Sequence, residues 1–282
     1  NTWSREFWMF IGSLVIFLSS IFICIATSLP VINKLFGTNW STGDDPKFSY
    51  NRIEIFIAII LGLLTATVQY LKYKNTSKSY FLKKLWPATA IALVISVCIS
   101  AFGGIHYTEY GTGYLAAIHL ALFGGVYSFI ANAGYIFTGL KGKVRASGPS
   151  VAHAGFGILL VGILISSAKQ EVLSINTTGI NLPFDPKSKQ NPLENITLLK
   201  DVKTDMGKYY TTYLSNDSVN KAGNIIYFRI NFQDKKTGES FDLWPNLIKN
   251  TKGVENYSNN PDKRHYIDHD IFTYISYANI LD

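Results

Sequence analysis

The chain has 282 residues, of which 48% are hydrophobic and only 16% carry a charge. This composition is too apolar for an ordinary soluble domain of this length. The formal net charge of +7 is unevenly placed: residues 1–168 hold 12 basic and 5 acidic residues, and residues 169–282 hold 14 of each. The basic excess therefore indicates membrane topology and contact with anionic membrane lipid, and it is no evidence for a nucleic-acid partner.

Long apolar runs precede residue 169, and none follows it. Each is close to the roughly 20 residues that cross a bilayer as a helix. We therefore predict an α-helical polytopic membrane core of five transmembrane helices in residues 1–168. The first run is too long for a signal-peptide core and lacks a small-residue cleavage site, so it is expected to be a real span. The runs are Phe7–Leu29, Ile53–Leu71, Leu85–Phe102, Leu115–Thr138 and Pro149–Ala168.

The ends of the sequence and the positions of its cysteines each support one limited expectation. The sequence begins at Asn1 without an initiator Met and ends at Asp282 in a strand-like segment, so we expect a piece of a longer protein. Cys24 and Cys98 both fall within apolar runs. Neither belongs to a Cys-x-x-Cys-His motif, so we expect packing roles for both and no haem attached covalently to this chain.

Basic residues are unevenly shared among the connections between the runs. Residues 72–84 contain five Lys and residues 141–145 contain three Lys or Arg, both without an acid, whereas residues 103–114 contain Glu109 and no Lys or Arg. The positive-inside rule places the two basic connections in the cytoplasm. The segment that follows the fifth run is then extracytoplasmic.

Residues 169–282 are expected to form a small extracytoplasmic all-β domain, either a barrel or a sandwich with its own core. In Asn224–Asp234, Ile226, Phe228, Ile230 and Phe232 alternate with polar side chains, which predicts a half-buried strand with these four facing inward. A turn at Lys235–Gly238 then leads to a hairpin partner at Ser240–Trp244. Further strands are predicted at Asn195–Val202, Tyr209–Leu214 and Ile271–Ile280, and an irregular loop at Asn181–Asn195.

His153 is the main candidate for a functional residue. It lies near the start of the fifth run among glycines and alanines, with no carboxylate nearby in sequence. An ionisable side chain within a membrane span is costly and is by default a functional-site hypothesis. A neutral imidazole is a good ligand for a metal or for haem iron, and the small neighbours leave a flat recess for a large planar ligand. The alternative is a His that makes only an interhelical hydrogen bond.

Six short motifs lie in order along nearly the whole chain: Ser4–Glu6, Thr27–Pro30, Phe48–Asn51, Ala152–Gly155, Pro261–Tyr266 and Asp270–Phe272. Together they resemble the C-terminal part of the cytochrome c maturation protein F (CcmF) family, the haem-lyase subunit. The corresponding family motifs are Ser-Arg-Glu, the Gly-Thr-Leu-x-Pro end of a span, an aromatic-Asn pair, Ala-His-x-Gly, Pro-Glu-Lys-Arg-x-Tyr and Asp-Leu-Tyr. This chain departs from them with Ala26 for Gly, Ser28 for Leu, Asp262 for Glu, and Ile271 and Phe272 for Leu and Tyr. Each motif alone is weak, and the resemblance depends on their order and spacing.

The resemblance implies a role in cytochrome c biogenesis in the bacterial cytoplasmic (inner) membrane. His153 would be an axial ligand of a structural b-type haem (heme b), and haem would also be the transferred substrate. The implied reaction joins reduced haem by thioether bonds to an apocytochrome c with a Cys-x-x-Cys-His motif. Other cytochrome c maturation subunits and a haem chaperone would be partners. The family's tryptophan-rich segment and its remaining haem-binding histidines lie upstream, so this fragment is expected to be inactive alone.

The other histidines are weaker candidates. His119 lies near the outer end of the fourth run and His153 near the inner end of the fifth, a depth difference of roughly 15–20 Å. Two axial ligands of one iron lie only about 4 Å apart, so His119 is expected to bond to another helix instead. His106 is expected at the surface. His265 and His269, with neighbouring aspartates, suggest either a metal site or, as we expect, plain surface placement.

A rival function belongs to a different class. The chain could be a non-catalytic membrane scaffold or receptor, in which the helices anchor a β-domain that binds a partner protein. In that case His153 only packs, and no haem is bound.

Overall fold

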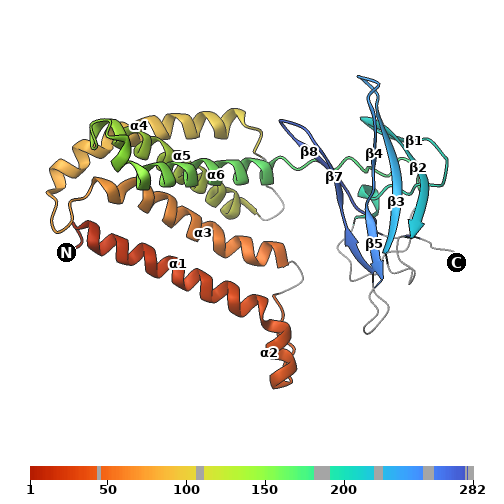
Figure 1. Cartoon of the computed structure of the whole chain (residues 1–282), viewed down its shortest axis with the longest axis horizontal. Helices are drawn as coiled ribbons and strands as arrows, with labels where there is room; N and C mark the ends of the chain where they lie inside the picture. The colour runs from red at the N-terminus through yellow and green to blue at the C-terminus, as the bar shows by residue number, and fades with distance from the viewer. Residues whose placement is uncertain are drawn as a thin grey trace. The chain divides into compact units, whose positions relative to one another are not determined.

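The computed structural model describes residues 1–42, 46–105, 111–180, 191–218, 225–249, 257–276 and 278. The chain divides into two compact units, Asn1–Gln170 and Glu171–Asp282. The first unit is helical and the second is built of strands (Figure 1). The boundary lies within two residues of the change in composition after Ala168.

The helical unit contains the expected long apolar helices. Five are long and apolar enough to cross a membrane. A shorter helix, α2, was not predicted from the sequence; it follows a break at Ser28, with Pro30 in its first turn, a position that suits proline. The helices are α1 (Arg5–Thr27), α2 (Leu29–Phe36), α3 (Pro46–Thr67, continued by a 3₁₀ turn at Val68–Tyr70), α4 (Lys78–Phe102), α5 (Gly111–Thr138) and α6 (Gly148–Ala168).

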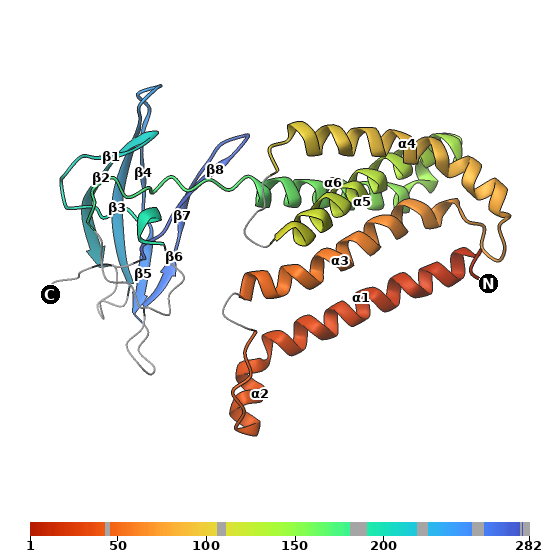
Figure 2. The same ribbon diagram turned by 180° about the vertical axis from the view of Figure 1, so that it is seen from behind.

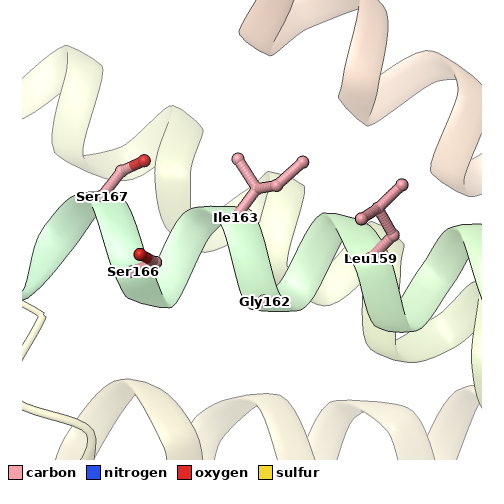
Figure 3. Close-up of a pocket in the computed structure, with 5 residues that line it drawn as sticks. All are labelled: Leu159, Gly162, Ile163, Ser166 and Ser167. Atoms are coloured by element: carbon pink, nitrogen blue, oxygen red, sulfur yellow. The ribbon is translucent and has the colours of Figure 1, made fainter. Parts of the chain in front are cut away.

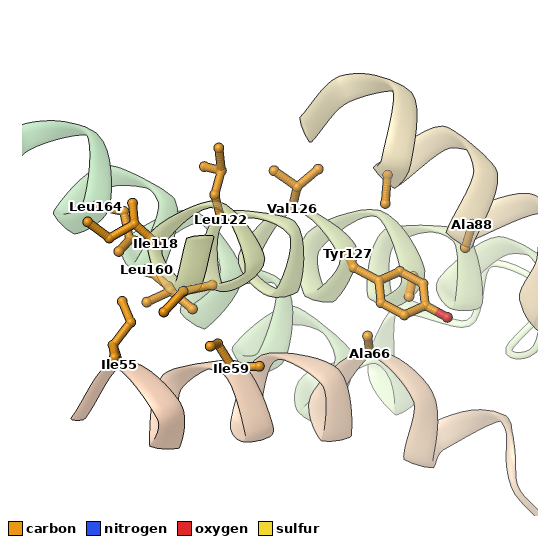
Figure 4. Packing of buried hydrophobic residues seen from close by; sticks show 14 of the residues in the cluster. Ile55, Ile59, Ala66, Ala88, Ile118, Leu122, Val126, Tyr127, Leu160 and Leu164 are labelled. Atoms are coloured by element: carbon orange, nitrogen blue, oxygen red, sulfur yellow. The ribbon is translucent and has the colours of Figure 1, made fainter. Parts of the chain in front are cut away.

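Helix α5 is the centre of this unit. It packs against α3, α4 and α6, while α1 lies along α3 at the edge (Figures 1 and 2). Buried aliphatic side chains of α3, α5 and α6, such as Ile59, Leu122 and Leu160, interlock between these helices (Figure 4). Where two backbones approach most closely, the residues are glycines: Gly62 faces Gly124, and Gly157 faces Gly125. Small residues at such contacts are typical of membrane helix packing.

Much of the apolar surface of the helical unit is uncovered. In the most apolar window of α1 only 6% of the residues are buried, against 56% for α5. Cys24 and Cys98 are exposed, so the prediction that both pack in the interior is wrong for this chain. Helices that are apolar on all sides and uncovered are suited to lipid or to further apolar helices, and not to water.

The strand unit is an open antiparallel sheet with a separate hairpin. Among the described residues the sheet order is β1-β2-β3-β5-β6, with β4 also paired to β3, and β7 and β8 form a separate two-stranded sheet. Pro245 separates β4 from β5, and its carbonyl still accepts a hydrogen bond from Phe228 N (2.9 Å), so both short strands follow the same edge of β3. The strands are β1 (Thr204–Met206), β2 (Tyr209–Ser218), β3 (Ile225–Asp234), β4 (Ser240–Leu243), β5 (Asn246–Lys249), β6 (Tyr257–Asn260), β7 (Asp262–His265) and β8 (Asp270–Thr273).

The predicted face of β3 is confirmed. Phe228, Ile230 and Phe232 are buried, and Ile226 packs against the same core. The β3–β4 hairpin is also confirmed, and Asp234 shapes its turn by accepting hydrogen bonds from the backbone N–H groups of Lys236 (2.7 Å) and Thr237 (2.8 Å). The backbone hydrogen bond from Thr237 is the main cause that lowers the pKa of Asp234; desolvation opposes it, and the bond from Lys236 adds to the lowering.

Two predicted strands differ from the structure. Asn195–Val202 is not a strand: apart from one bridge between Lys200 and Tyr213, its backbone joins no ladder, because β1 pairs with the adjoining part of β2. Ile196 and Leu198 pack against the sheet core all the same, which explains the strand-like pattern, whereas Leu199 and Val202 are exposed. Ile271–Ile280 is a strand only as far as Thr273, and residues 277 and 279–280 lie outside the described residues. So do residues 181–190 of the predicted loop.

Candidate functional site

His153 lies in the second turn of α6, which Pro149 helps to start. Its side chain is half-buried, on the border between the packed side and the open side of the helix. Its backbone carbonyl accepts a hydrogen bond from Ser128 Oγ of α5 (3.0 Å). Within the part of the chain that the structure describes, no hydrogen bond reaches the imidazole, so both ring nitrogens remain available to a ligand or to another chain segment.

A layer of polar groups connects α3, α5 and α6 beside His153. Thr65 Oγ1 and Ser128 Oγ are 2.9 Å apart, and Asn132 Nδ2 donates to the carbonyls of Thr65 (3.0 Å) and Ser128 (2.7 Å). One turn beyond Thr65, Gln69 Oε1 accepts a hydrogen bond from Ser150 Oγ of α6 (3.1 Å). We call Thr65, Gln69, Ser128, Asn132 and Ser150 the polar layer.

Two atoms of the polar layer lack a partner. Asn132 is fully buried and its Oδ1 accepts no hydrogen bond, and the buried Nε2 of Gln69 donates none, among the described residues. A buried polar atom without a partner is costly and marks a place where a water molecule or another polar group belongs. The unpaired atoms therefore set this end of the bundle apart from the apolar packing elsewhere.

The start of α1 is fastened to the same end of the unit. Arg5 donates from Nε to the carbonyl of Leu71 (3.0 Å) and from Nη2 to that of Gln69 (2.6 Å). Ser4 caps α1 by accepting from Phe7 N (3.3 Å). The Ser-Arg-Glu motif thus holds the first helix against the end of α3, next to the polar layer.

The small residues around His153 lie on two different sides of α6. A Cβ on Gly157 would collide with the backbone of α5, whereas one on Gly155 or Gly162 would meet nothing within 4 Å. The open side carries a shallow hollow of about 370 Å³, lined by Leu159, Gly162 and Ile163 with two serines (Figure 3). His153 is not among its lining residues. The exposed Ala152 and Gly155 leave the side of α6 next to His153 flat, as the sequence suggests.

His119 makes the predicted interhelical contact. Its Nδ1 lies 2.8 Å from Ser100 Oγ, which joins α5 to α4 near the opposite end of the unit from the polar layer. One ring nitrogen is therefore already in a hydrogen bond. The structure does not bring His119 and His153 together.

His265 and His269 lie at the surface of the β7–β8 hairpin. Each is exposed and bonds one aspartate: His265 Nδ1 is 2.5 Å from Asp270 Oδ1, and His269 Nδ1 is 2.9 Å from Asp268 Oδ1. The described residues contain no group of three metal-binding side chains. These two pairs therefore do not form a metal centre with each other, in line with the expected surface placement. His106 lies outside the described residues.

The basic residues just before His265 form a strand. Lys263 and Arg264 belong to β7, and Arg264 Nη2 lies 3.0 Å from Glu239 Oε1. The Pro-Glu-Lys-Arg-like motif is thereby an ordered edge of the hairpin.

Sequence reasoning missed one ionisable residue in a span. Glu54 of α3 is half-buried and accepts a hydrogen bond from Ser19 Oγ of α1, at 3.2 Å from Oε1. The signal was present, because Glu54 is an acid at the edge of an otherwise apolar run. The polar layer had no comparable signal, since Gln69 and Asn132 are far apart in sequence.

Comparison of the chain with protein-family models, with curated proteins and with solved structures finds no significant match in any of the three.

Proposed function

We propose that this chain is the membrane core and exported domain of a haem-lyase component of cytochrome c biogenesis, with His153 as one axial ligand of a buried b-type haem. In this proposal the helical unit spans the bacterial cytoplasmic membrane, and the strand unit is extracytoplasmic. The substrates are haem and an apocytochrome c with a Cys-x-x-Cys-His motif. Other maturation subunits and a haem chaperone supply and receive them.

The observation that carries the proposal is the state of the His153 side chain. It is half-buried in an apolar helix, has no hydrogen-bond partner among the described residues, and adjoins the flat surface of Ala152 and Gly155. A histidine that only packs or bridges helices would be expected to resemble His119, whose ring is bonded to Ser100. The residues present therefore fit one axial ligand and one open flank of a haem.

Each residue near His153 has a definite part in this proposal. His153 would hold the haem iron through an imidazole nitrogen, and Ser128 bonds the backbone carbonyl of the α6 turn that carries this side chain. A b-type haem, when bound, supplies one-electron chemistry, with a potential set by its axial ligands and burial. The second imidazole and the remaining cover come from segments upstream of this chain, because His119 lies at the other end of the bundle.

The test compares two histidine variants in the complete protein at equal protein level. His153→Ala is expected to remove or strongly shift the haem absorbance in the reduced-minus-oxidised spectrum, and to abolish maturation of a reporter cytochrome c. His119→Ala is expected to leave the spectrum close to that of the wild type. An unchanged spectrum in His153→Ala, or a loss in His119→Ala alone, contradicts the proposal.

The scaffold function is the second candidate. His153 is not among the lining residues of the hollow on the open side of α6 or of the hollow lined by Leu82, Leu85, Trp86, Thr89 and Tyr127. If the complete protein, purified without added haem, shows no haem spectrum and yet its strand unit captures another biogenesis subunit, the scaffold function is the better account.

A further inference from the structure

The connection between α3 and α4 and the first two turns of α4 carry a dense positive charge. Lys72, Lys74, Lys78, Lys83 and Lys84 are all exposed, within 13 residues that contain no acid. Glu6 of α1 adjoins this segment through its backbone, whose N–H bonds the carbonyl of Tyr73 (3.4 Å). We call the exposed side of residues 72–86 the basic platform.

The backbone of the basic platform is held in place by the start of α1. Arg5 N donates to the carbonyl of Lys72 (2.9 Å), and Thr76 N donates to that of Trp3 (2.8 Å). Within the connection, Lys72 N donates to Thr76 Oγ1 (2.8 Å). Because these bonds order the backbone that carries Lys72 and Lys74, less conformational entropy is lost when these side chains bind a ligand.

Aromatic residues accompany the lysines. Tyr73, Tyr80 and Trp86 are 60%, 45% and 70% exposed, and Lys72 Nζ lies 5.3 Å from the centre of the Tyr80 ring. Exposed Tyr and Trp beside basic residues at the end of an apolar helix are typical of the headgroup level of a membrane. The aromatic rings therefore indicate at which depth the lysines act.

An apolar hollow continues from the platform along α4 toward the middle of the span. It has a volume of about 510 Å³ and is lined by Leu82, Leu85, Trp86, Thr89 and Tyr127. The hydroxyl groups of Thr89 and Tyr127 are bonded to each other (2.8 Å), so they satisfy one another within the lining. A hollow of this lining suits a hydrocarbon chain and not a hydrated ion.

We propose that the basic platform and this hollow form one binding site for an anionic phospholipid. The lysines contact the phosphate-bearing headgroup, and an acyl chain occupies the hollow beside Leu82 and Trp86. The inference rests on the membrane placement in the proposed function and does not depend on haem. A soluble polyanion would use the lysines but not the hollow, and a neutral lipid would use the hollow but not the lysines.

The test measures lipid binding to the detergent-purified complete protein by native mass spectrometry. Phosphatidylglycerol and phosphatidylcholine with the same acyl chains are titrated separately. The test variant carries Lys74→Gln, Lys78→Gln, Lys83→Gln and Lys84→Gln. The control variant makes the same change in charge elsewhere, at Lys34, Lys169, Lys200 and Lys236, which are all exposed.

Phosphatidylglycerol is expected to bind the wild type and the control variant at least about tenfold more tightly than the test variant, because each Lys near an anionic surface adds a few-fold in affinity. Arginine at the four tested positions should restore binding. Glycerol phosphate, which lacks acyl chains, should not displace the lipid.

Equal binding to test and control variants, equal binding of both lipids, or displacement by glycerol phosphate would each overturn the proposal. If the test variant does not fold, Lys83→Gln with Lys84→Gln alone should show a smaller loss in the same direction. The haem spectrum of the same samples is independent of this result.

Discussion

Replacing Gly157 by alanine should push α6 away from α5. An added Cβ would lie 2.5 Å from the carbonyl oxygen of Gly125 and 2.8 Å from the backbone nitrogen of Phe129. Because both atoms belong to the backbone of a helix, neither can rotate aside. To reach an ordinary contact the helices must separate locally by about 1 Å. The same movement would stretch the 3.0 Å bond from Ser128 to the His153 carbonyl beyond hydrogen-bonding range.

The expected cost follows from comparable overpacking. Extra methyl groups in a well-packed interior lower the free energy of unfolding by about 1–3 kcal/mol. The higher helix propensity of alanine offsets about 0.5–1 kcal/mol of this loss. Gly157→Ala should therefore lower the unfolding midpoint in a denaturant titration of the detergent-purified protein. Gly155→Ala is the matched control on the open side of the same helix, where a Cβ meets nothing within 4 Å, and should be neutral or stabilising.

A second pair of variants tests the same reasoning at the α3–α5 contact. A Cβ on Gly62 would lie 2.8 Å from the backbone of Gly124, whereas one on Gly124 would lie 3.6 Å from Gly62. Gly62→Ala should thus destabilise and Gly124→Ala should be tolerated. If Gly157→Ala is as stable as Gly155→Ala, and the two α3–α5 variants do not differ, the close backbone contacts do not exist as described.

Three further outcomes are expected. Reporter fusions after Lys78 and after Asp217 should place the first site in the cytoplasm and the second outside it, because two connections carry an excess of basic residues. A cytoplasmic signal from the Asp217 fusion would contradict this topology. Phe228→Asp should unfold the strand unit, because it leaves a charge in the core at a cost of several kcal/mol. In the control variant Gln233→Asp, on the other face of the same strand, the unit should still fold, and urea titration would measure both. The pKa of Asp234 is lower in the folded state. The ionised Asp234 side chain therefore stabilises the fold fully above the pKa of the unfolded state, about 3.9, and this stabilisation is lost as pH falls through the lower pKa of the folded state. Below about pH 4 the urea midpoint of the wild type should thus fall more than that of Asp234→Asn.

The long helices and the alternating strand could be predicted because their signals are local. An apolar run of membrane-spanning length predicts a helix wherever it lies, although α3 and α4 begin about two turns before their apolar runs because polar residues are tolerated at helix ends. The short strands β5, β6 and β7 could not be predicted. Asp262–His265 carries charge on nearly every residue, and it is a strand only because Asp270–Thr273 pairs with it. The strand predicted at Asn195–Val202 does not form because strand pairing is again decided by the partner: Ile196 and Leu198 reach the core, but the backbone makes only one bridge, between Lys200 and Tyr213.

The candidate site was predictable to the extent that one residue marks it. His153 stands out in sequence because an imidazole within an apolar run needs an explanation, but its surroundings depend on contacts between distant segments. Gln69, Asn132 and Ser150 come from three different helices, and only packing brings them into one layer. The glycines next to His153 show the same limit, since sequence alone does not tell that Gly157 is locked against α5 while Gly155 faces outward. On the closed side Ser128 bonds the backbone carbonyl of His153, and among the described residues no hydrogen bond reaches the imidazole. The proposed axial ligand needs an unbonded ring nitrogen, which is why the His153→Ala spectrum is the most decisive measurement on this chain.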